Sequence, residues 1–319
     1  MLRDTLETQT RLGKTEKKVC IVVVNYNGKN FLRNLLDSLI RKTGYQNYQV
    51  VLVDNGSTDG SVKFVEKTYP RVRLIRNFEN LGYSIANNQG IRACDADYYL
   101  LLNTDMKIHT KDYLTNLVNL SESDRSIGIV TCCQPSSKED LAKSLKKCRD
   151  PPAEVDFAPG SLMLVRKETI DDIGALEEEF TPAYFEDTDL CCRALSAGWK
   201  IVYDPSTIVF HFGEGTAKKV FAKIPQYFHV FVRNRLMFDV MNHSLTDLPR
   251  DLYSELRWLG SALFVGTGSE RKEKLCSLGK AYNEAFSRMH RLIYKRRKRK
   301  LLKRRGSARF TRKTGHYAL

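Results

Sequence analysis

The chain has 319 residues, of which 42% are hydrophobic and 28% charged, and its formal net charge is +15 at pH 7. This length suits one large core with a smaller appendage, since single cores seldom exceed roughly 250 residues. Residues 288–319 contain 14 Lys or Arg and no acid, which leaves a charge of +1 for the rest. A near-neutral body argues against a nucleic-acid groove across the folded domain, so nucleic acid is not an expected partner.

Residues 1–18 are polar and charged and contain no apolar stretch of the kind that a secretory signal or a membrane span needs. The eight cysteines lack the paired spacing of a zinc site or of a secreted disulfide framework. We therefore expect a cytoplasmic protein with reduced, mostly buried thiols.

The first third of the chain alternates apolar runs with helical patterns. The apolar runs are residues 19–24, 50–53, 72–75 and 98–102, and helical patterns at 31–39 and 62–65 follow the first two. Unbroken, β-branched runs are typical of strands buried on both faces. The alternation predicts an α/β fold with a mostly parallel sheet and helices on both faces.

The rest of the chain gives less regular patterns. An extended segment is expected at 155–165, an acidic stretch at 177–189, a helix at 190–197, strands near Ile201 and Ile208, and helices at 225–241 and 275–293. We expect four regions, namely a polar extension (1–16), an α/β domain (17–216), a helical region (217–294) and a polybasic tail (295–319).

Polar side chains follow three predicted strands where each strand ends. They are Asn25 with Asn27, then Asp54, then Asn103 with Asp105. Right-handed crossovers place such strand ends along one edge, where open α/β sheets bind their ligands. A carboxylate at Asp54 can accept a hydrogen bond from a base or a ribose, although turn chemistry alone also explains it.

A carboxylate at Asp105 can hold a hard divalent cation, which would bridge the phosphates of a nucleotide. The alternative is an ordinary Asn/Asp turn at the end of the strand. His211 closes a predicted strand and begins a glycine-containing turn suited to a phosphate or a metal, although a lone histidine there is more often structural.

Glu186 and Asp187 stand just ahead of the helix predicted at 190–197. Free amides and the helix dipole at that position would keep Asp187 ionised and lower its basicity. An ionised carboxylate is what a general base needs before it takes a proton from a hydroxyl, and capping is equally compatible.

Together these segments resemble glycosyltransferase family 2, the inverting enzymes with a Rossmann-like GT-A fold, and especially its rhamnosyltransferase-like branch. The resemblance runs from about Val19 to His211 and more loosely to Asn242. It implies a GT-A domain followed by a helical C-terminal region. It also implies transfer of rhamnose or another hexose, with inversion, from a nucleotide diphosphate donor to a hydroxyl of a lipid-linked or polysaccharide acceptor.

The resemblance also implies roles for individual residues. It gives nucleotide binding to Asn25, Asn27, Asp54, Asn80, Gly82 and Asn103, catalysis to Asp187 as base with Glu186, and the metal to Asp105 and His211. In this resemblance residues 103–105 form the metal motif. Because its first residue is Asn103, only Asp105 supplies a carboxylate there. Imidazole from His211 would suit manganese better than magnesium. The segment 233–235 is expected to face the diphosphate or the acceptor.

Partners follow from the same residues. A carboxylate at Asp54 suits the N–H of thymine or uracil, and dTDP or UDP is favoured over GDP, although guanine also offers donors. Apolar positions recur from Leu278 to Leu292 at spacings of three and four, ahead of the basic run at 295–300. This pattern predicts an amphipathic helix on an anionic membrane surface, hence a peripheral protein at the inner face of the membrane. A solvated or nucleic-acid-binding tail is the rival interpretation, and an oligomer is compatible with the sequence.

Two other functions stay open. A sugar-phosphate nucleotidyltransferase would share the α/β core and the metal, but no glycine-rich, lysine-bearing loop follows the first strand. A non-catalytic GT-A relative would keep the fold as a binding module without metal dependence.

Overall fold

The computed structural model describes residues 16–213, 224–243 and 268–302, with Tyr253, Arg257 and Gly260 between them. Most of the expected extension at 1–16 and residues 303–319 of the expected tail lie outside the described residues.

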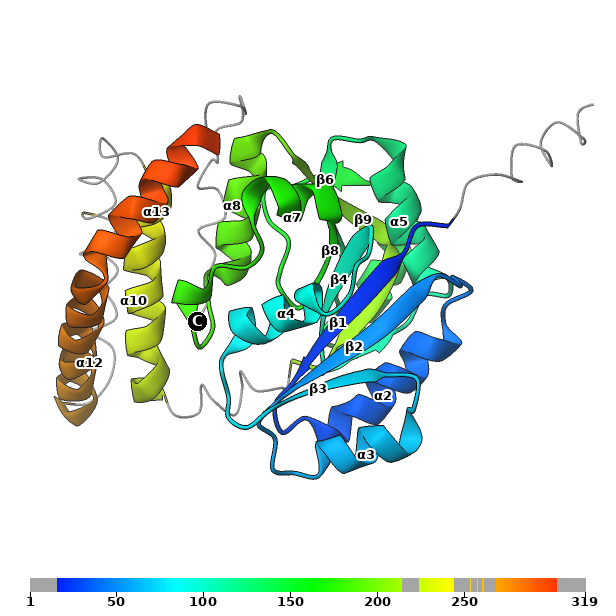
Figure 1. The fold of residues 1–319 in the computed structure, drawn as a ribbon, viewed down its shortest axis with the longest axis horizontal. Coiled ribbons are helices and arrows are strands. Elements are labelled where there is room, and N and C mark those ends of the chain that lie inside the picture. Colours follow the sequence, from blue (N-terminus) through cyan, green and yellow to red (C-terminus); the bar gives the residue numbers. More distant parts are fainter. Residues whose placement is uncertain are drawn as a thin grey trace, which may run out of the picture.

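The centre of the molecule is a mixed sheet with the strand order β3-β2-β1-β4-β8-β6-β9-β5, with β7 paired to β9 (Figure 1). The strands are β1 (Val19–Asn25), β2 (Tyr48–Asn55), β3 (Arg73–Asn77), β4 (Tyr98–Asn103), β5 (Met106–Ile108), β6 (Ile127–Cys133), β7 (Ala153–Glu154), β8 (Leu162–Arg166) and β9 (Lys200–His211). Strands β3, β2, β1 and β4 run parallel, as do β6 and β9. The remaining pairings are antiparallel.

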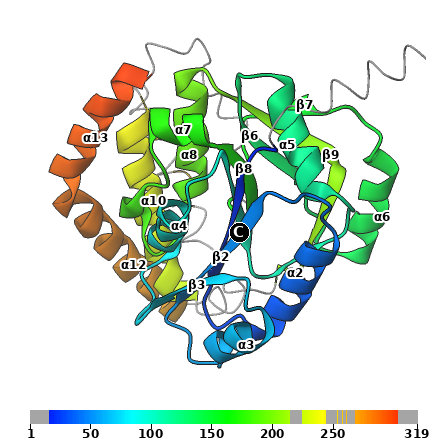
Figure 2. The ribbon, with the colours of Figure 1, turned by 45° about the vertical axis from the view of Figure 1, so that its right-hand side comes forward.

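Helices cover both faces of the sheet (Figure 2). They are α2 (Lys29–Arg41), α3 (Ser61–Thr68), α4 (Tyr83–Arg92), α5 (Tyr113–Ser123), α6 (Lys138–Lys147), α7 (Lys167–Ile173), α8 (Glu186–Ala197), α10 (Ile224–Asn242), α12 (Gly268–Ser287) and α13 (Met289–Leu302), with a short 3-10 turn η1 (Glu178–Phe180). Helices α2, α3 and α5 pack in one core, whereas α4, α7 and α8 pack in the other.

The position of strand β1 between two layers of helices explains why residues 19–24 are apolar throughout. Val19, Ile21 and Val23 contribute to the core beneath α2, while Cys20 and Val22 face the core beneath α4. Since side chains alternate across a strand, a strand covered on both sides needs apolar residues at every position. The predicted parallel arrangement of the first four apolar runs is therefore confirmed.

Several elements differ from the expectation. Of the extended segment expected at 155–165, only residues 162–165 belong to a strand, β8. Residues 200–211 form one long strand, β9, instead of two. Helix α8 begins at Glu186 and not at the expected residue 190. The residue before it, Phe185, has a left-handed backbone conformation that is not part of the helix. The helix expected at 275–293 is divided at Arg288 between α12 and α13.

The C-terminal helices form an outer layer against α8. Leu278, Ala285 and Leu292, which belong to the expected membrane-binding face, are buried in clusters with residues of α10. These three residues of the face are therefore covered by the protein itself, whereas Tyr282 and Ile293 of the same face are exposed. Among the helices that the structure describes, none has an apolar stretch long enough to cross a bilayer.

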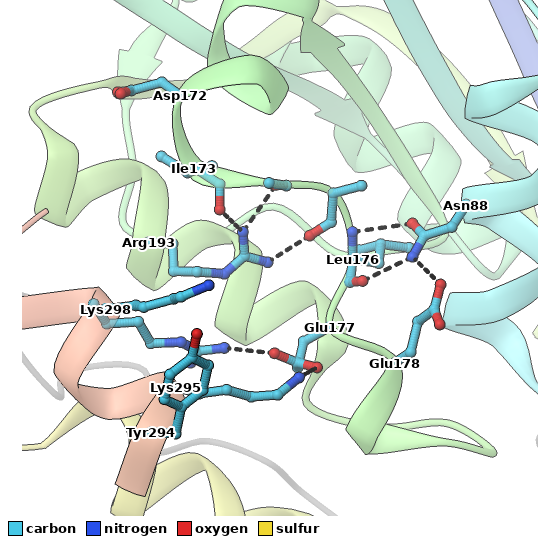
Figure 3. Close-up of a pocket in the computed structure, with 13 residues that line it drawn as sticks. Asn88, Asp172, Ile173, Leu176, Glu177, Glu178, Arg193, Tyr294, Lys295 and Lys298 are labelled. Carbon is cyan, nitrogen blue, oxygen red and sulfur yellow. Dashed lines mark hydrogen bonds and ion pairs between the residues drawn. The ribbon is translucent and has the colours of Figure 1, made fainter. Parts of the chain in front are cut away.

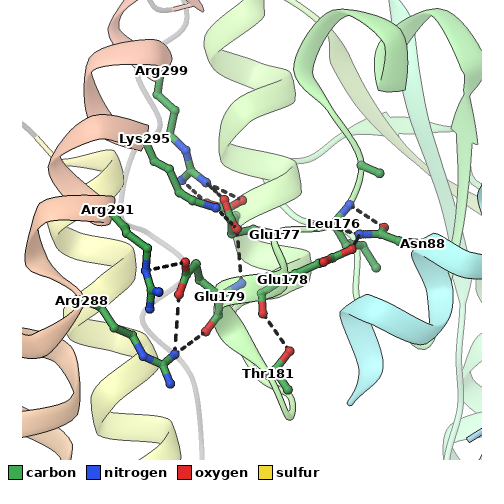
Figure 4. A network of polar contacts seen from close by, with 12 residues as sticks. Asn88, Leu176, Glu177, Glu178, Glu179, Thr181, Arg288, Arg291, Lys295 and Arg299 are labelled. Carbon is green, nitrogen blue, oxygen red and sulfur yellow. Dashed lines mark hydrogen bonds and ion pairs between the residues drawn. The ribbon is translucent and has the colours of Figure 1, made fainter. Parts of the chain in front are cut away.

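Basic residues of α13 also point inward (Figure 4). Arg291 pairs with Glu179 at 3.2 Å, and Lys295 pairs with Glu177 at 2.6 Å. Arg299 reaches the fully buried Asp189 of α8. The boundary expected between residues 294 and 295 thus falls inside a helix whose first basic turns are ion-paired with the α/β domain.

Candidate active site

The polar residues predicted to converge do lie on one edge of the sheet. In the register of the parallel strands, Asn25 is opposite Asp54, and Val24 is opposite Asn103. Strands β2, β1 and β4 are neighbours, so their carboxyl ends form one continuous edge. This is the edge at which open α/β sheets bind ligands.

Asp54 is almost completely buried at the end of β2. Its Oδ1 accepts a hydrogen bond from Asn25 Nδ2 at 2.8 Å, and its Oδ2 accepts one from the Ser57 amide at 3.0 Å. Each carboxylate oxygen keeps further acceptor capacity. Within the described residues, the buried Oδ1 of Asn25 accepts no hydrogen bond. An orphaned buried acceptor next to a carboxylate suits a ligand that brings N–H or O–H donors.

Asn27 follows β1 with a positive φ of 52°, a conformation that asparagine tolerates better than most residues. Its Oδ1 accepts a hydrogen bond from the Thr58 amide at 2.8 Å. Asn27 therefore ties the loop after β1 to the loop after β2, and any contact that it makes with a nucleotide stays a prediction.

Asn80 and Gly82 shape the loop before α4. Asn80 Oδ1 accepts hydrogen bonds from Asn55 Nδ2 at 2.8 Å and from the Gly82 amide at 3.0 Å. Gly82 has a φ of +88°, and a Cβ at this position would lie 2.7 Å from Thr181 Cγ2. Both residues have a clear role in the loop, and their role in nucleotide binding stays a prediction.

Asp105 and His211 are brought together by the pairing of β5 with β9, in which Met106 is opposite His211. His211 Nε2 lies 3.3 Å from Asp105 Oδ2, and the Asp105 side chain is largely buried. Within the described residues, no group of three or more His, Cys, Asp or Glu is arranged to hold a metal. One carboxylate and one imidazole would nevertheless fit a manganese ion whose other ligands are diphosphate oxygens and water.

The acidic pair lies in the first turn of α8. Asp187 is partly exposed, and its Oδ2 accepts a hydrogen bond from the Gly160 amide at 3.0 Å while Oδ1 accepts one from the Thr188 amide at 2.7 Å. Glu186 is buried, and its Oε2 accepts no hydrogen bond from the described residues.

The structure corrects the expected basicity of this pair. Loss of hydration raises the pKa of Asp187 despite the opposing amide hydrogen bonds. Burial and then the charge of Asp187 raise the pKa of Glu186 well above its usual range. The effect of desolvation on the pKa outweighs that of the amide hydrogen bonds at the helix start. Asp187 is therefore a stronger base than its sequence position indicates.

Tyr83, at the start of α4, contacts Gly160, the residue whose amide donates to Asp187. Its hydroxyl donates to the Gly160 carbonyl at 2.5 Å. Burial raises the pKa of Tyr83, and Glu186, Asp187 and Asp105 each raise it further. The residue after Gly160, Ser161, accepts a hydrogen bond from the Asn103 amide at 2.9 Å, so the loop that contacts Asp187 also contacts the end of the strand that precedes Asp105. We did not predict a separate role for Tyr83, and its position directly after Gly82 was the available signal.

A cavity of about 620 Å³ lies elsewhere, between α13 and the loop that joins α7 to α8 (Figure 3). None of the predicted site residues lines it. Arg193 donates to the carbonyl oxygens of that loop, and Lys295 and Arg299 pair with Glu177. The basic groups of Arg193, Lys295 and Arg299 are thus already occupied by partners within the protein. Because the predicted site residues lie at the strand edge and not in this cavity, we locate the candidate site at that edge.

Comparison with known proteins supports the expected family for part of the chain. The model of glycosyl transferase family 2 matches residues 20–173. This segment is a family 2 glycosyl transferase domain. The match contains β1 to β4, the edge with Asp54, and Asp105, and the acidic pair and His211 lie beyond it.

Curated relatives agree with the family. A Mycobacterium tuberculosis N-acetylglucosaminyl-diphospho-decaprenol L-rhamnosyltransferase is 29% identical over 60% of this chain and 75% of its own length. An uncharacterised protein of Sinorhizobium fredii is 23% identical over 60% of this chain, and the match spans only 24% of that protein.

A solved structure supports the fold. The crystal structure of GalNAc-T7 with UDP, GalNAc and Mn2+ superposes with a TM-score of 0.60 at 15% identity, covering 83% of this chain and 55% of that one. The expected fold, a GT-A domain with a helical C-terminal region, is therefore confirmed.

Proposed function

We propose that this family 2 domain makes the chain a metal-dependent, inverting glycosyltransferase. The observation that carries the proposal is that one loop contacts both parts of the candidate site. The Gly160 amide donates to Asp187, and the next residue, Ser161, accepts from the amide of Asn103 at the end of β4. His211 lies beside Asp105 just after that strand. A base and a pair of metal ligands at the carboxyl edge of an α/β sheet suit group transfer from a nucleotide diphosphate.

The reaction is a single displacement. The acceptor hydroxyl oxygen attacks the anomeric carbon, and the bond from that carbon to the diphosphate oxygen breaks with its electron pair on the diphosphate. Asp187 takes the hydroxyl proton, and its raised pKa makes it a better proton acceptor near neutral pH. A divalent cation held by Asp105 and His211, manganese or magnesium, supplies charge stabilisation for the leaving diphosphate.

The nucleotide would lie along the edge formed by Asn25, Asn27, Asp54, Asn80, Gly82 and Asn103. A buried carboxylate at Asp54 suits the ring N–H of the base in dTDP or UDP, the donors we favour, although guanine in GDP also offers N–H donors. The name of the mycobacterial relative supports rhamnose as one donor sugar and a lipid-linked saccharide as one acceptor class.

Such an acceptor would make attachment to the inner face of a membrane useful. With Leu278, Ala285 and Leu292 buried, attachment would depend on exposed apolar residues such as Phe286 and Ile293 and on exposed basic residues such as Arg297 and Lys298, together with the basic residues beyond 302. Cytoplasmic location, and assembly into an oligomer, belong to the proposal as well.

The test is calorimetric titration of UDP, dTDP and GDP, each with and without Mn²⁺. We expect one pyrimidine nucleotide to bind in a manganese-dependent manner. Asp105→Asn should reduce the manganese-dependent gain in affinity by about tenfold or more, since a ligand carboxylate is lost.

Asp112→Asn is the matched control, because Asp112 lies in the loop before α5, beside the C-terminal end of α2, where its Oδ1 accepts from the Gly44 amide. It should bind like the wild type. Absence of binding by all three nucleotides would overturn the proposal and favour a non-catalytic binding module.

A further inference from the structure

The backbone just ahead of the acidic pair has an unusual conformation. Tyr184 and Phe185 both have positive φ values, 80° and 74°. Two consecutive bulky residues in the left-handed region are energetically unfavourable, and they persist only where the surroundings enforce them. The next two residues are Glu186 and Asp187, so whatever enforces this turn also aims the carboxylates.

One side chain of α10 spans this turn. Asn234 is fully buried, and its Nδ2 donates to the carbonyl oxygens of Phe180 at 2.7 Å, Ala183 at 2.8 Å and Tyr184 at 3.0 Å. Its Oδ1 accepts from Arg233 Nε at 2.9 Å. Because three acceptors surround the nitrogen and a donor faces the oxygen, the amide has one satisfactory orientation.

Arg233 extends this contact to the next helix. Its guanidinium donates to the Thr181 carbonyl and to Glu284 Oε2 of α12, the latter at 2.9 Å. The segment 180–184 is therefore held by α10, and α10 is in turn held by α12. The sequence analysis expected residues 233–235 to face the diphosphate or the acceptor, whereas Arg233 and Asn234 point at backbone carbonyls.

We propose that Asn234 is a positioning residue that fixes the turn at 180–185 and thereby aims Asp187 at the acceptor. It acts through backbone carbonyls and touches no substrate. The inference rests on the proposed role of Asp187 as base. It also gives the C-terminal helices a part in catalysis, since the residue comes from outside the domain matched by the family model.

The test compares Asn234→Ala with Asn242→Ala. Asn242 is also buried on α10, but its Nδ2 donates to Asp189 and to Phe238, and its Oδ1 accepts from Arg299. Hydrogen–deuterium exchange of a peptide covering 180–185, which excludes Asp189, is measured together with kcat for sugar transfer and Kd for UDP or dTDP with Mn²⁺. Arg233→Lys serves as a milder second variant, because it keeps the charge beside Glu284 and loses the contact to Asn234.

For Asn234→Ala we expect faster exchange in 180–185, a kcat lower by on the order of 100-fold, and an unchanged Kd, because small misplacements of a catalytic group are costly. Arg233→Lys should show the same changes to a smaller extent, and it decides the matter if Asn234→Ala does not fold. Asn242→Ala should keep both the exchange of this peptide and kcat.

Equal exchange and equal kcat in the two alanine variants would overturn the inference. So would a parallel loss of kcat and nucleotide affinity, which indicates general damage to the fold. If the wild type transfers no sugar, the proposed function fails, while the exchange measurement still decides whether Asn234 holds the turn.

Discussion

Glu186 is a buried carboxyl next to a second carboxyl, and its Oε2 accepts no hydrogen bond from the described residues. Such a group is costly to ionise, so the fold keeps its proton at pH values where the unfolded chain releases it. The sequence indicated that Glu186 and Asp187 belong together. It did not reveal the direction of their pKa shifts, since those depend on packing by segments distant in sequence, such as the loop with Gly160.

This proton linkage predicts a pH-dependent stability. In the unfolded chain Glu186 ionises near 4.5, whereas the folded-state pKa is well above that value. As the pH rises from 4.5 toward the folded-state pKa, the free energy of unfolding falls, by up to about 1.4 kcal/mol per pH unit. Glu186→Gln removes this cost. The Tm of the variant minus the Tm of the wild type should therefore increase from about pH 5 to about pH 8.

Thermal unfolding at both pH values checks the prediction. Glu168→Gln, a change at an exposed residue of α7, should show no such pH-dependent gain. A constant Tm difference between Glu186→Gln and the wild type would contradict the raised pKa.

At the scale of elements, the loop before α4 meets the segment before α8. The Tyr83 amide donates to the Pro182 carbonyl at 2.7 Å, directly after Gly82. The sequence revealed α4 as a helix next to a polar loop. It did not reveal this contact, because the two segments are about 100 residues apart and neither has a pattern that depends on the other.

We expect Gly82→Ala to destabilise the protein by about 1–3 kcal/mol, because it combines a positive φ with a Cβ placed against Thr181 and Pro182. Gly279→Ala on α12 is the control, since a Cβ there meets nothing within 4 Å. That change should leave stability equal or raise it by up to about 1 kcal/mol, because alanine favours a helix. Denaturant unfolding measures both, and equal stabilities would show that the loop contact is not tight.

At the scale of the whole molecule, the first four strands could be predicted because parallel strands covered on both faces must be apolar throughout. The position of the C-terminal helices could not. A basic run such as 295–300 is usually solvated, and only the folded chain shows that Lys295 and Arg299 match Glu177 and Asp189, more than 100 residues earlier (Figure 4). The polar edge was predictable because the ends of parallel strands converge by topology. The hydrogen bonds from Asn234 to the turn at 180–185 were not, because they join segments about 50 residues apart in sequence.

The central claim is that Asp187 is the base of a sugar transfer, and comparing Asp187→Asn with the wild type tests it most directly. The measurement pairs transfer from dTDP-rhamnose or a UDP-sugar to a polyprenyl-diphosphate-linked N-acetylglucosamine with calorimetric binding of the nucleotide and Mn²⁺. Asp171→Asn, which changes only an exposed ion pair with Lys167, is the control. We predict that Asp187→Asn binds the nucleotide as the wild type does while kcat falls by about 10² to 10⁴-fold. Transfer by Asp187→Asn at the rate of the wild type would contradict the account.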